Sequence, residues 1–263
     1  MKFDFTIEVY RQLLETLQSA GYKFFTFASW CEGEAEGVDK YIILRHDIDK
    51  YPEHALRIAH VESAMKIKSS YYWLTRKPLY HPVIIKKIAA MGHEIGYHYR
   101  DWVDAKGQGE RALELFQMNL AKMQALTKIK TIAMDGCPWS KYNNRDMWQQ
   151  YDYHSFGIIG EPYFDIFGAG EKDAVPDIFY LTDTGRLWNG DRFSVRDKVS
   201  VNRIQDYRTT HQLVEVILEG KLPHKIMITT HPQRWSDDYL EWLSEFVMQG
   251  CKNMVKWILV NLK

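Results

Sequence analysis

Residues 41 to 49 read Tyr41-Ile42-Ile43-Leu44-Arg45-His46-Asp47-Ile48-Asp49, an apolar run that turns polar at its carboxyl end. A short continuous apolar run is typical of a strand that is buried on both faces, as in a parallel sheet. After Pro52, which suits the first turn of a helix, the spacing of Ile58, Val61 and Met65 predicts a helix. The stretch therefore predicts a strand–helix unit whose strand ends in acids and a histidine.

The same alternation of strand and helix continues on both sides of this unit. Further strands are predicted at residues 22–27, 70–74, 95–98, 129–134 and 225–228. Helices are predicted at 6–20, 81–91, 113–123 and 209–218, and two more begin at Asp237 and near Val255. Repeated strand–helix units favour a parallel sheet, and we expect a single (β/α) barrel.

The segment from Gly157 to Asn202 interrupts the alternation, because it contains six glycines and two prolines. Long irregular segments inside compact domains are uncommon and are often functional loops. We interpret it as loop and short strands over the barrel mouth.

Length and composition limit the kinds of protein that the chain can be. Its 263 residues, 46% of them hydrophobic, suit one domain over 1–263. Lysine plus arginine (34) balances aspartate plus glutamate (34), which disfavours a nucleic-acid partner. No signal peptide or membrane-spanning run is seen, so we expect a cytoplasmic protein. The cysteines are odd in number, and we expect Cys31, Cys137 and Cys251 to be reduced thiols.

Two further stretches place histidines beside predicted strands, as the first one does. They read Gly92-His93-Glu94-Ile95-Gly96-Tyr97-His98 and Thr229-Thr230-His231-Pro232-Gln233-Arg234-Trp235. Carboxyl ends of parallel strands open onto one face, so these residues can meet there although they are distant in sequence. Acids and histidines gathered in this way favour a metallohydrolase.

The chemistry of the three stretches suggests distinct roles. Asp47 and Asp49 are two apart and share a face if the strand runs through both, so one can bind a metal while the other accepts a proton. The competing interpretation is that Arg45 simply pairs with an acid. His93 and His98 are five apart and face opposite ways; His98 is the better ligand, and His93 is expected to pack or cap. His231, which ends its strand before Pro232, can act as a general acid.

Together these motifs resemble the polysaccharide deacetylase superfamily, the NodB-like carbohydrate esterase family 4, and in particular a divergent intracellular branch that opens with Arg-His-Asp-x-Asp. The resemblance covers the chain from about Tyr41 to Trp235. It implies a distorted (β/α) barrel with fewer than eight regular units. It also implies a divalent metal, usually zinc, and hydrolysis of an N-acetyl, or less often O-acetyl, group on a sugar.

The resemblance also implies residue roles. Asp47 resembles the general base, and Asp49 and His98 resemble metal ligands; the reverse assignment of the two acids stays open, because Ile48 separates acids that are adjacent in the main family. The position of the second metal histidine holds Trp102, which cannot bind zinc. Asp101, His46 or Asp135 are alternatives for completing the site, and Asp135 is the one that we carry as a candidate ligand.

The remaining motifs of the family line a substrate groove and supply the acid. His231 resembles the general acid, and a carboxylate such as Asp183 would favour its charged form. The expected substrate-binding residues follow from the third, fourth and fifth motifs: Trp139, Asp183, Trp188, Arg234 and Trp235. The metal would acidify its bound water and polarise the acetyl carbonyl, while Asp47 takes the proton of the water.

The leading hypothesis is a cytoplasmic metal-dependent deacetylase acting on an acetylated sugar or glycan precursor. A catalytically degenerate barrel that binds glycan or a protein partner is the first alternative, because Trp102 and Asp135 depart from the family pattern. Another metallohydrolase, such as a phosphoesterase, is the second. The balanced charge and the absence of a Gly-rich phosphate cradle argue against it.

Overall fold

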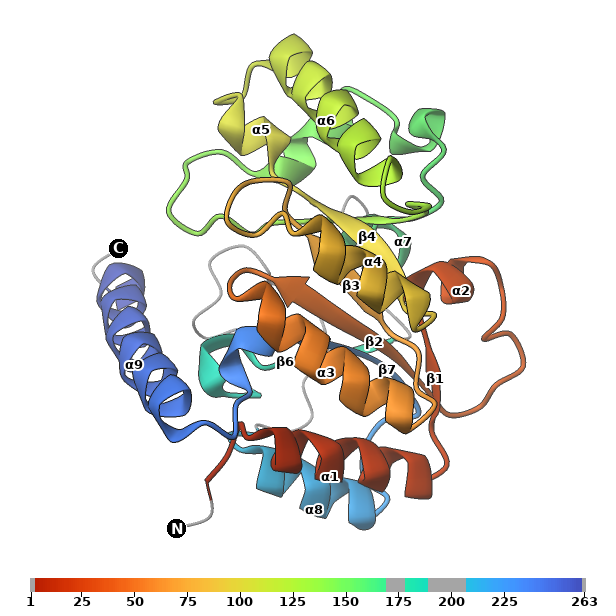
Figure 1. Ribbon diagram of the computed structural model, residues 1–263, viewed down its shortest axis with the longest axis vertical. Helices are drawn as coiled ribbons and strands as arrows, with labels where there is room; N and C mark the ends of the chain where they lie inside the picture. Colours follow the sequence, from red (N-terminus) through yellow and green to blue (C-terminus); the bar gives the residue numbers. More distant parts are fainter. Residues whose placement is uncertain (1–2, 169–177, 189–206, 262–263) are drawn as a thin grey trace.

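The computed structural model describes residues 3–168, 178–188 and 207–261, with side chains through residue 254. Its strands form a seven-stranded parallel sheet that curves into a half-barrel and is wrapped by helices (Figure 1). The strands are β1 (Lys23–Phe25), β2 (Tyr41–Ile48), β3 (Ser70–Trp73), β4 (Glu94–Tyr99), β5 (Ile132–Met134), β6 (Phe179–Thr182) and β7 (Lys225–Thr230). The distorted (β/α) barrel expected from the sequence is confirmed.

The helices follow the strands as expected for α/β units. The longer ones are α1 (Ile7–Ser19), α3 (Pro52–Ala64), α4 (Pro82–Ala90), α6 (Gly109–Gln124), α8 (Thr210–Leu218) and α9 (Tyr239–Asn261). Short helices are α2 (Phe27–Cys31), α5 (Asp101–Asp104) and α7 (Pro162–Asp165), and the 3-10 turns are η1 (Asn144–Gln149), η2 (Tyr153–Phe156), η3 (Thr184–Arg186) and η5 (Pro232–Arg234). Helices α1 and α8 lie side by side against the sheet (Figure 1).

Strand β2 is the centre of the sheet, whose order is β5-β4-β3-β2-β7-β6 with β1 paired to β2. All eight of its residues are buried. It pairs with β7 along 41–46, and on its other side with β1 along 41–43 and then with β3 along 45–48. This central position explains why the run from Tyr41 to Leu44 is apolar without alternation.

Local signals set several of the element boundaries. The Thr6 side chain caps α1 by accepting from the Val9 amide, and Gly21 follows that helix with φ 87°. Thr209 and Gln212 form a capping box at the start of α8. The predicted strand at 22–27 is shorter in the structure, because Thr26 caps helix α2.

Two other sequence predictions are revised. The two helices expected after Asp237 are one helix, α9, which continues through Gly250. Parts of the predicted loop at 157–202 lie outside the described residues, and its described part contains helix α7, strand β6 and η3. Cys31, Cys137 and Cys251 are free thiols, as expected. Within the described ranges, no helix combines the length and apolar character needed to cross a bilayer.

Candidate active site

The register of the sheet brings Asp49 and His98 to one level and His231 to the level of Asp47. Ile48 on β2 and Tyr97 on β4 both pair with Trp73 on β3, so Asp49 and His98 each lie one residue beyond the same point. On the other side of β2, His46 pairs with Thr230, and His231 follows Thr230. Curvature of the half-barrel turns these strand ends toward one another.

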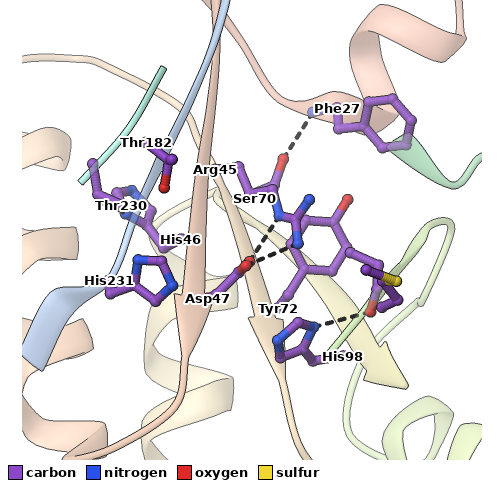
Figure 2. Close-up of polar contacts among 12 residues, drawn as sticks. Phe27, Arg45, His46, Asp47, Ser70, Tyr72, His98, Thr182, Thr230 and His231 are labelled. Atoms are coloured by element: carbon purple, nitrogen blue, oxygen red, sulfur yellow. Dashed lines mark hydrogen bonds and ion pairs between the residues drawn. The ribbon is translucent and has the colours of Figure 1, made fainter. Parts of the chain in front are cut away.

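Asp47 is held by a buried arginine two residues before it on the same strand face. Arg45 Nε lies 2.7 Å from Asp47 Oδ1, and Arg45 Nη2 lies 2.8 Å from Oδ2. Figure 2 shows this bidentate pair, with the rings of His231 and His98 on either side of Asp47. Burial raises the pKa of Asp47, but the charge and hydrogen bonds of Arg45, together with the charges of His98 and His231, outweigh burial, so that the net pKa is below its ordinary value. Asp47 is therefore an anion at neutral pH.

Asp49 lies between two imidazoles. Its Oδ1 is 3.8 Å from His98 Nε2, and its Oδ2 is 3.7 Å from His231 Nε2. Strand β2 ends one residue earlier, at Ile48, and the Asp49 side chain is 39% exposed. Partial burial and the nearby Asp135 raise its pKa, against the lowering effect of His231.

Hydrogen bonds fix the orientation of both rings. His98 Nδ1 is 2.9 Å from the Ala133 carbonyl, which can only accept, so Nδ1 carries the proton and Nε2 presents a lone pair toward Asp49. His231 Nδ1 is 2.6 Å from Asp183 Oδ1 and 2.9 Å from Arg234 Nη1. We assign its proton to the shorter contact, with the carboxylate.

Asp183 is a buried anchor rather than a groove residue. It follows strand β6, and its carboxylate accepts hydrogen bonds from the His231 amide, Arg234 Nη1 and Trp235 Nε1. Burial raises its pKa, but the charges of Arg234 and His231 lower it to about 2. The prediction that Asp183 contacts substrate is therefore corrected: it positions His231 and Arg234.

The side chains of Asp49, His98 and His231 are of the types that bind a divalent ion. A carboxylate and two imidazole nitrogens are common zinc ligands, with bond lengths of roughly 2.0–2.2 Å that set neighbouring donors about 3.4 Å apart. The observed separations of 3.8 and 3.7 Å are slightly longer. Among the described residues, no group of three His, Cys, Asp or Glu side chains can hold a metal ion as it stands. Binding therefore requires the side chains to draw together.

A cavity of about 450 Å³ adjoins Asp49. Asp135, Trp139 and Arg234 also line it, and Trp139 is 64% exposed, so its ring is accessible for stacking. Asp135 accepts from Arg100 Nη1 at 3.2 Å and from the Cys137 amide. Burial and Asp135 raise the pKa of the Cys137 thiol to about 12, which disfavours a nucleophile.

Two of the predicted substrate-binding residues, Trp188 and Trp235, are buried in the core. Trp188 is 1% exposed and donates to Thr210 Oγ1, and Trp235 is fully buried and donates to Asp183 Oδ2. Neither ring can reach a sugar, because each packs in the core and its N–H is already bonded.

The other proposed ligands also lie elsewhere. His46 is fully buried and lies between Thr230 Oγ1 and Glu62 Oε1, both at 2.7 Å. Asp101 is buried and accepts from Tyr97 and Asn119. His93 packs between Ser69 and the Ala59 carbonyl, as expected.

The sequence indicated one charged partner near the site and missed others. The pairing of Arg45 with an acid, the competing interpretation for this motif, is confirmed: the acid is Asp47, on the same strand face. Lys50, Arg76, Arg100 and Lys252 line the cavity, and no sequence motif marked any of the four.

Neither a protein-family model nor a curated protein sequence matches the chain. Solved structures do resemble it. A carbohydrate esterase family 4 (CE4) pseudoenzyme from Bacillus anthracis, BA3943, shares 13% identity and a TM-score of 0.45 over 81% of this chain. The Xyl-CE4 domain of a multidomain xylanase from the hindgut metagenome of Trinervitermes trinervoides shares 13% identity over 82% of this chain and 84% of that one, with a TM-score of 0.42. Bacillus subtilis PdaA, a family 4 carbohydrate esterase, shares 10% sequence identity over 92% of this chain and 83% of that one, with a TM-score of 0.42.

These structures come from the family that the sequence motifs resemble. The chain spans 60% of the length of the Bacillus anthracis protein.

Proposed function

We propose that the protein is a metal-dependent hydrolase that removes an acetyl group, N-acetyl rather than O-acetyl, from a sugar or glycan precursor. The observation that supports this most directly is the position of Asp49 between His98 Nε2 and His231 Nε2, beside the arginine-bound Asp47 and next to a cavity.

Asp49 and His98 would hold the ion. When bound, a divalent ion would polarise the acetyl carbonyl and acidify the attacking water. The fixed Nδ1–H of His98 keeps its Nε2 lone pair turned toward Asp49, which is the usual way that a ligand histidine is oriented.

Asp47 would accept the proton of the attacking water. Arg45 occupies one lone-pair direction on each carboxylate oxygen, and each oxygen keeps another for a new hydrogen bond. The same pair holds the carboxylate in one orientation, which keeps the base aimed at the water.

His231 would protonate the departing sugar nitrogen through Nε2. Asp183 holds the opposite nitrogen at 2.6 Å and so fixes the ring. The competing role for His231 is that of a third metal ligand, since its Nε2 also faces Asp49.

A barrel that binds glycan without turnover is the competing function. It is favoured by the absence of a ready three-ligand group among the described residues and by Trp102, which is buried where a second ligand histidine was expected.

Two matched substitutions test the metal site. Asp49→Asn should lose zinc binding. Asp47→Asn should keep one equivalent of zinc per chain, but its rate of acetate release should fall about 10²–10⁴-fold, the usual contribution of a positioned base. Zinc content by mass spectrometry and acetate release from an N-acetylhexosamine are the measurements. Asp39→Asn, a distant exposed acid, is the control.

Folding of each variant is checked by its melting curve, because Asp47→Asn leaves the buried Arg45 without its charge partner. Loss of zinc in Asp47→Asn would reverse the roles of the two acids, making Asp47 the metal ligand and Asp49 the base. A wild-type protein that neither binds zinc nor releases acetate would support the glycan-binding barrel.

A further inference from the structure

The cavity beside Asp49 is positively charged although the whole chain has no net charge. Among the described residues, five cations line it, against three carboxylates: Lys50, Arg76, Arg100, Arg234 and Lys252 against Asp49, Asp135 and Glu245. Since the proposed reaction needs no such excess, the charge points to a feature of the substrate.

Three of the five cations have an acid of the protein as a partner. Arg100 pairs with Asp104 and Asp135, Arg234 pairs with Asp183, and Lys50 pairs with Glu245 over the longest of these distances. Lys50, Arg76 and Lys252 form what we call the cationic rim.

The cationic rim has little carboxylate to balance it. Lys50 Nζ is 3.4 Å from Glu245 Oε2 and 3.0 Å from the Met248 sulfur, a weak acceptor. Burial lowers the pKa of Lys252, and the nearby positive charge of Lys50 lowers it further. Within the described ranges, Arg76 makes no ion pair with a carboxylate.

The cavity wall next to the rim has unused hydrogen-bonding capacity. Gln233 and Arg234 are only 6% and 7% exposed, and both line the cavity. Among the described residues, Arg234 Nε and Gln233 Oε1 have no hydrogen-bond partner, although buried polar groups normally have one.

We infer that the sugar substrate carries an anionic group, a carboxylate or a phosphate, which binds the cationic rim while the acetyl group lies at Asp49 and His98. This inference rests on the proposed hydrolase function. Helix α9 supplies Lys252, Glu245 and Gln249 to the cavity, so the rim joins three separate elements: the ends of β2 and β3 and this helix (Figure 1). A cavity of about 450 Å³ is in the range of small-molecule sites.

Calorimetry with four ligands tests the charge preference: N-acetylglucosamine, its 1-phosphate, its 6-phosphate and the corresponding uronic acid. At least one anionic ligand should bind about tenfold or more tightly than the neutral sugar, as expected for charge-assisted hydrogen bonds. The tighter class identifies phosphate or carboxylate as the group recognised. Equal binding of the neutral and all anionic ligands would overturn the inference.

Variants locate the preference in the rim. Lys252→Gln and Arg76→Gln should each weaken anionic binding by about tenfold and leave the neutral sugar unchanged. Lys86→Gln, which removes the same charge from an exposed residue of α4 outside the cavity, should change neither. A preference that survives both rim substitutions would also overturn the inference.

Acetate release in the same samples separates this inference from the proposed function. A rim-dependent preference without acetate release supports the anionic ligand and contradicts the hydrolase. Acetate release from the neutral sugar with no preference supports the hydrolase and contradicts the anionic ligand.

Discussion

Arg45 and Asp47 illustrate how two neighbouring side chains create a defined charge in a buried strand. Each ion alone would be costly to bury, but two parallel hydrogen bonds satisfy both. The sequence spacing placed the pair on one face, and this part of the site could be predicted. The buried positions of Trp188 and Trp235 could not, because a tryptophan in a groove and one in a core have the same local sequence signal.

His231 is the residue whose role is most open to measurement. His231→Ala should reduce hydrolysis of an N-acetyl substrate by about 10²–10⁴-fold, because an amine leaves poorly without a proton. An activated aryl acetate should be affected far less, since its leaving group departs as an anion. Rates on both substrates, together with zinc content, are the measurements.

The matched control for His231 is His224→Ala, an exposed histidine far from the site that pairs with Asp39. Equal losses on both substrates with zinc intact would contradict the general-acid role. Loss of zinc would instead make His231 the third ligand.

At the level of elements, strand ends determine which residues meet. The elements themselves were predicted well, because buried apolar runs and helical spacing are strong local signals. Their ends were predicted less well. Strand β2 continues to Ile48, four residues beyond the apolar run that ends at Leu44, since pairing with β3 and β7 extends it through polar residues. The long helix α9 was split in the prediction because Gly250 weakens the helical signal.

Close packing of β3 against β4 depends on Gly96. A Cβ at this position would lie 2.3 Å from Tyr72 Cε1, well inside contact distance. Gly96→Ala should therefore lower the free energy of unfolding by about 1–3 kcal/mol, the usual cost of overpacking. Denaturant unfolding measures this.

Gly250→Ala is the control for that substitution, because a Cβ at position 250 meets nothing within 4 Å. It should be neutral or stabilising by up to about 1 kcal/mol, as expected for a helix interior. If Gly96→Ala unfolds at the same denaturant concentration as wild type, the packing described for β3 and β4 is wrong.

At the level of the whole molecule, a buried acid links stability to pH. Glu161 is fully buried, and burial raises its pKa to about 7 despite the opposing charge of Arg45. Its unfolded value is about 4.3, so the folded state binds the proton more tightly. The stability that Glu161 contributes should therefore fall as pH rises from about 4.3 to 7, by roughly 4 kcal/mol at most.

Glu161→Gln should flatten that fall, because glutamine does not titrate. Unfolding free energies of the two proteins between about pH 4.5 and pH 8 provide the comparison. Parallel curves would contradict the assignment of this pH dependence to Glu161.

The central claim is that this half-barrel binds a divalent ion at Asp49 and His98 and uses it to hydrolyse an acetyl group. The most direct measurement is acetate release from N-acetylated sugars, neutral and anionic, as zinc is titrated into metal-free wild-type protein. Acetate release should be absent without metal and should rise to a plateau at one equivalent per chain. Release that is unaffected by metal removal, or no release with one equivalent bound, would contradict the account.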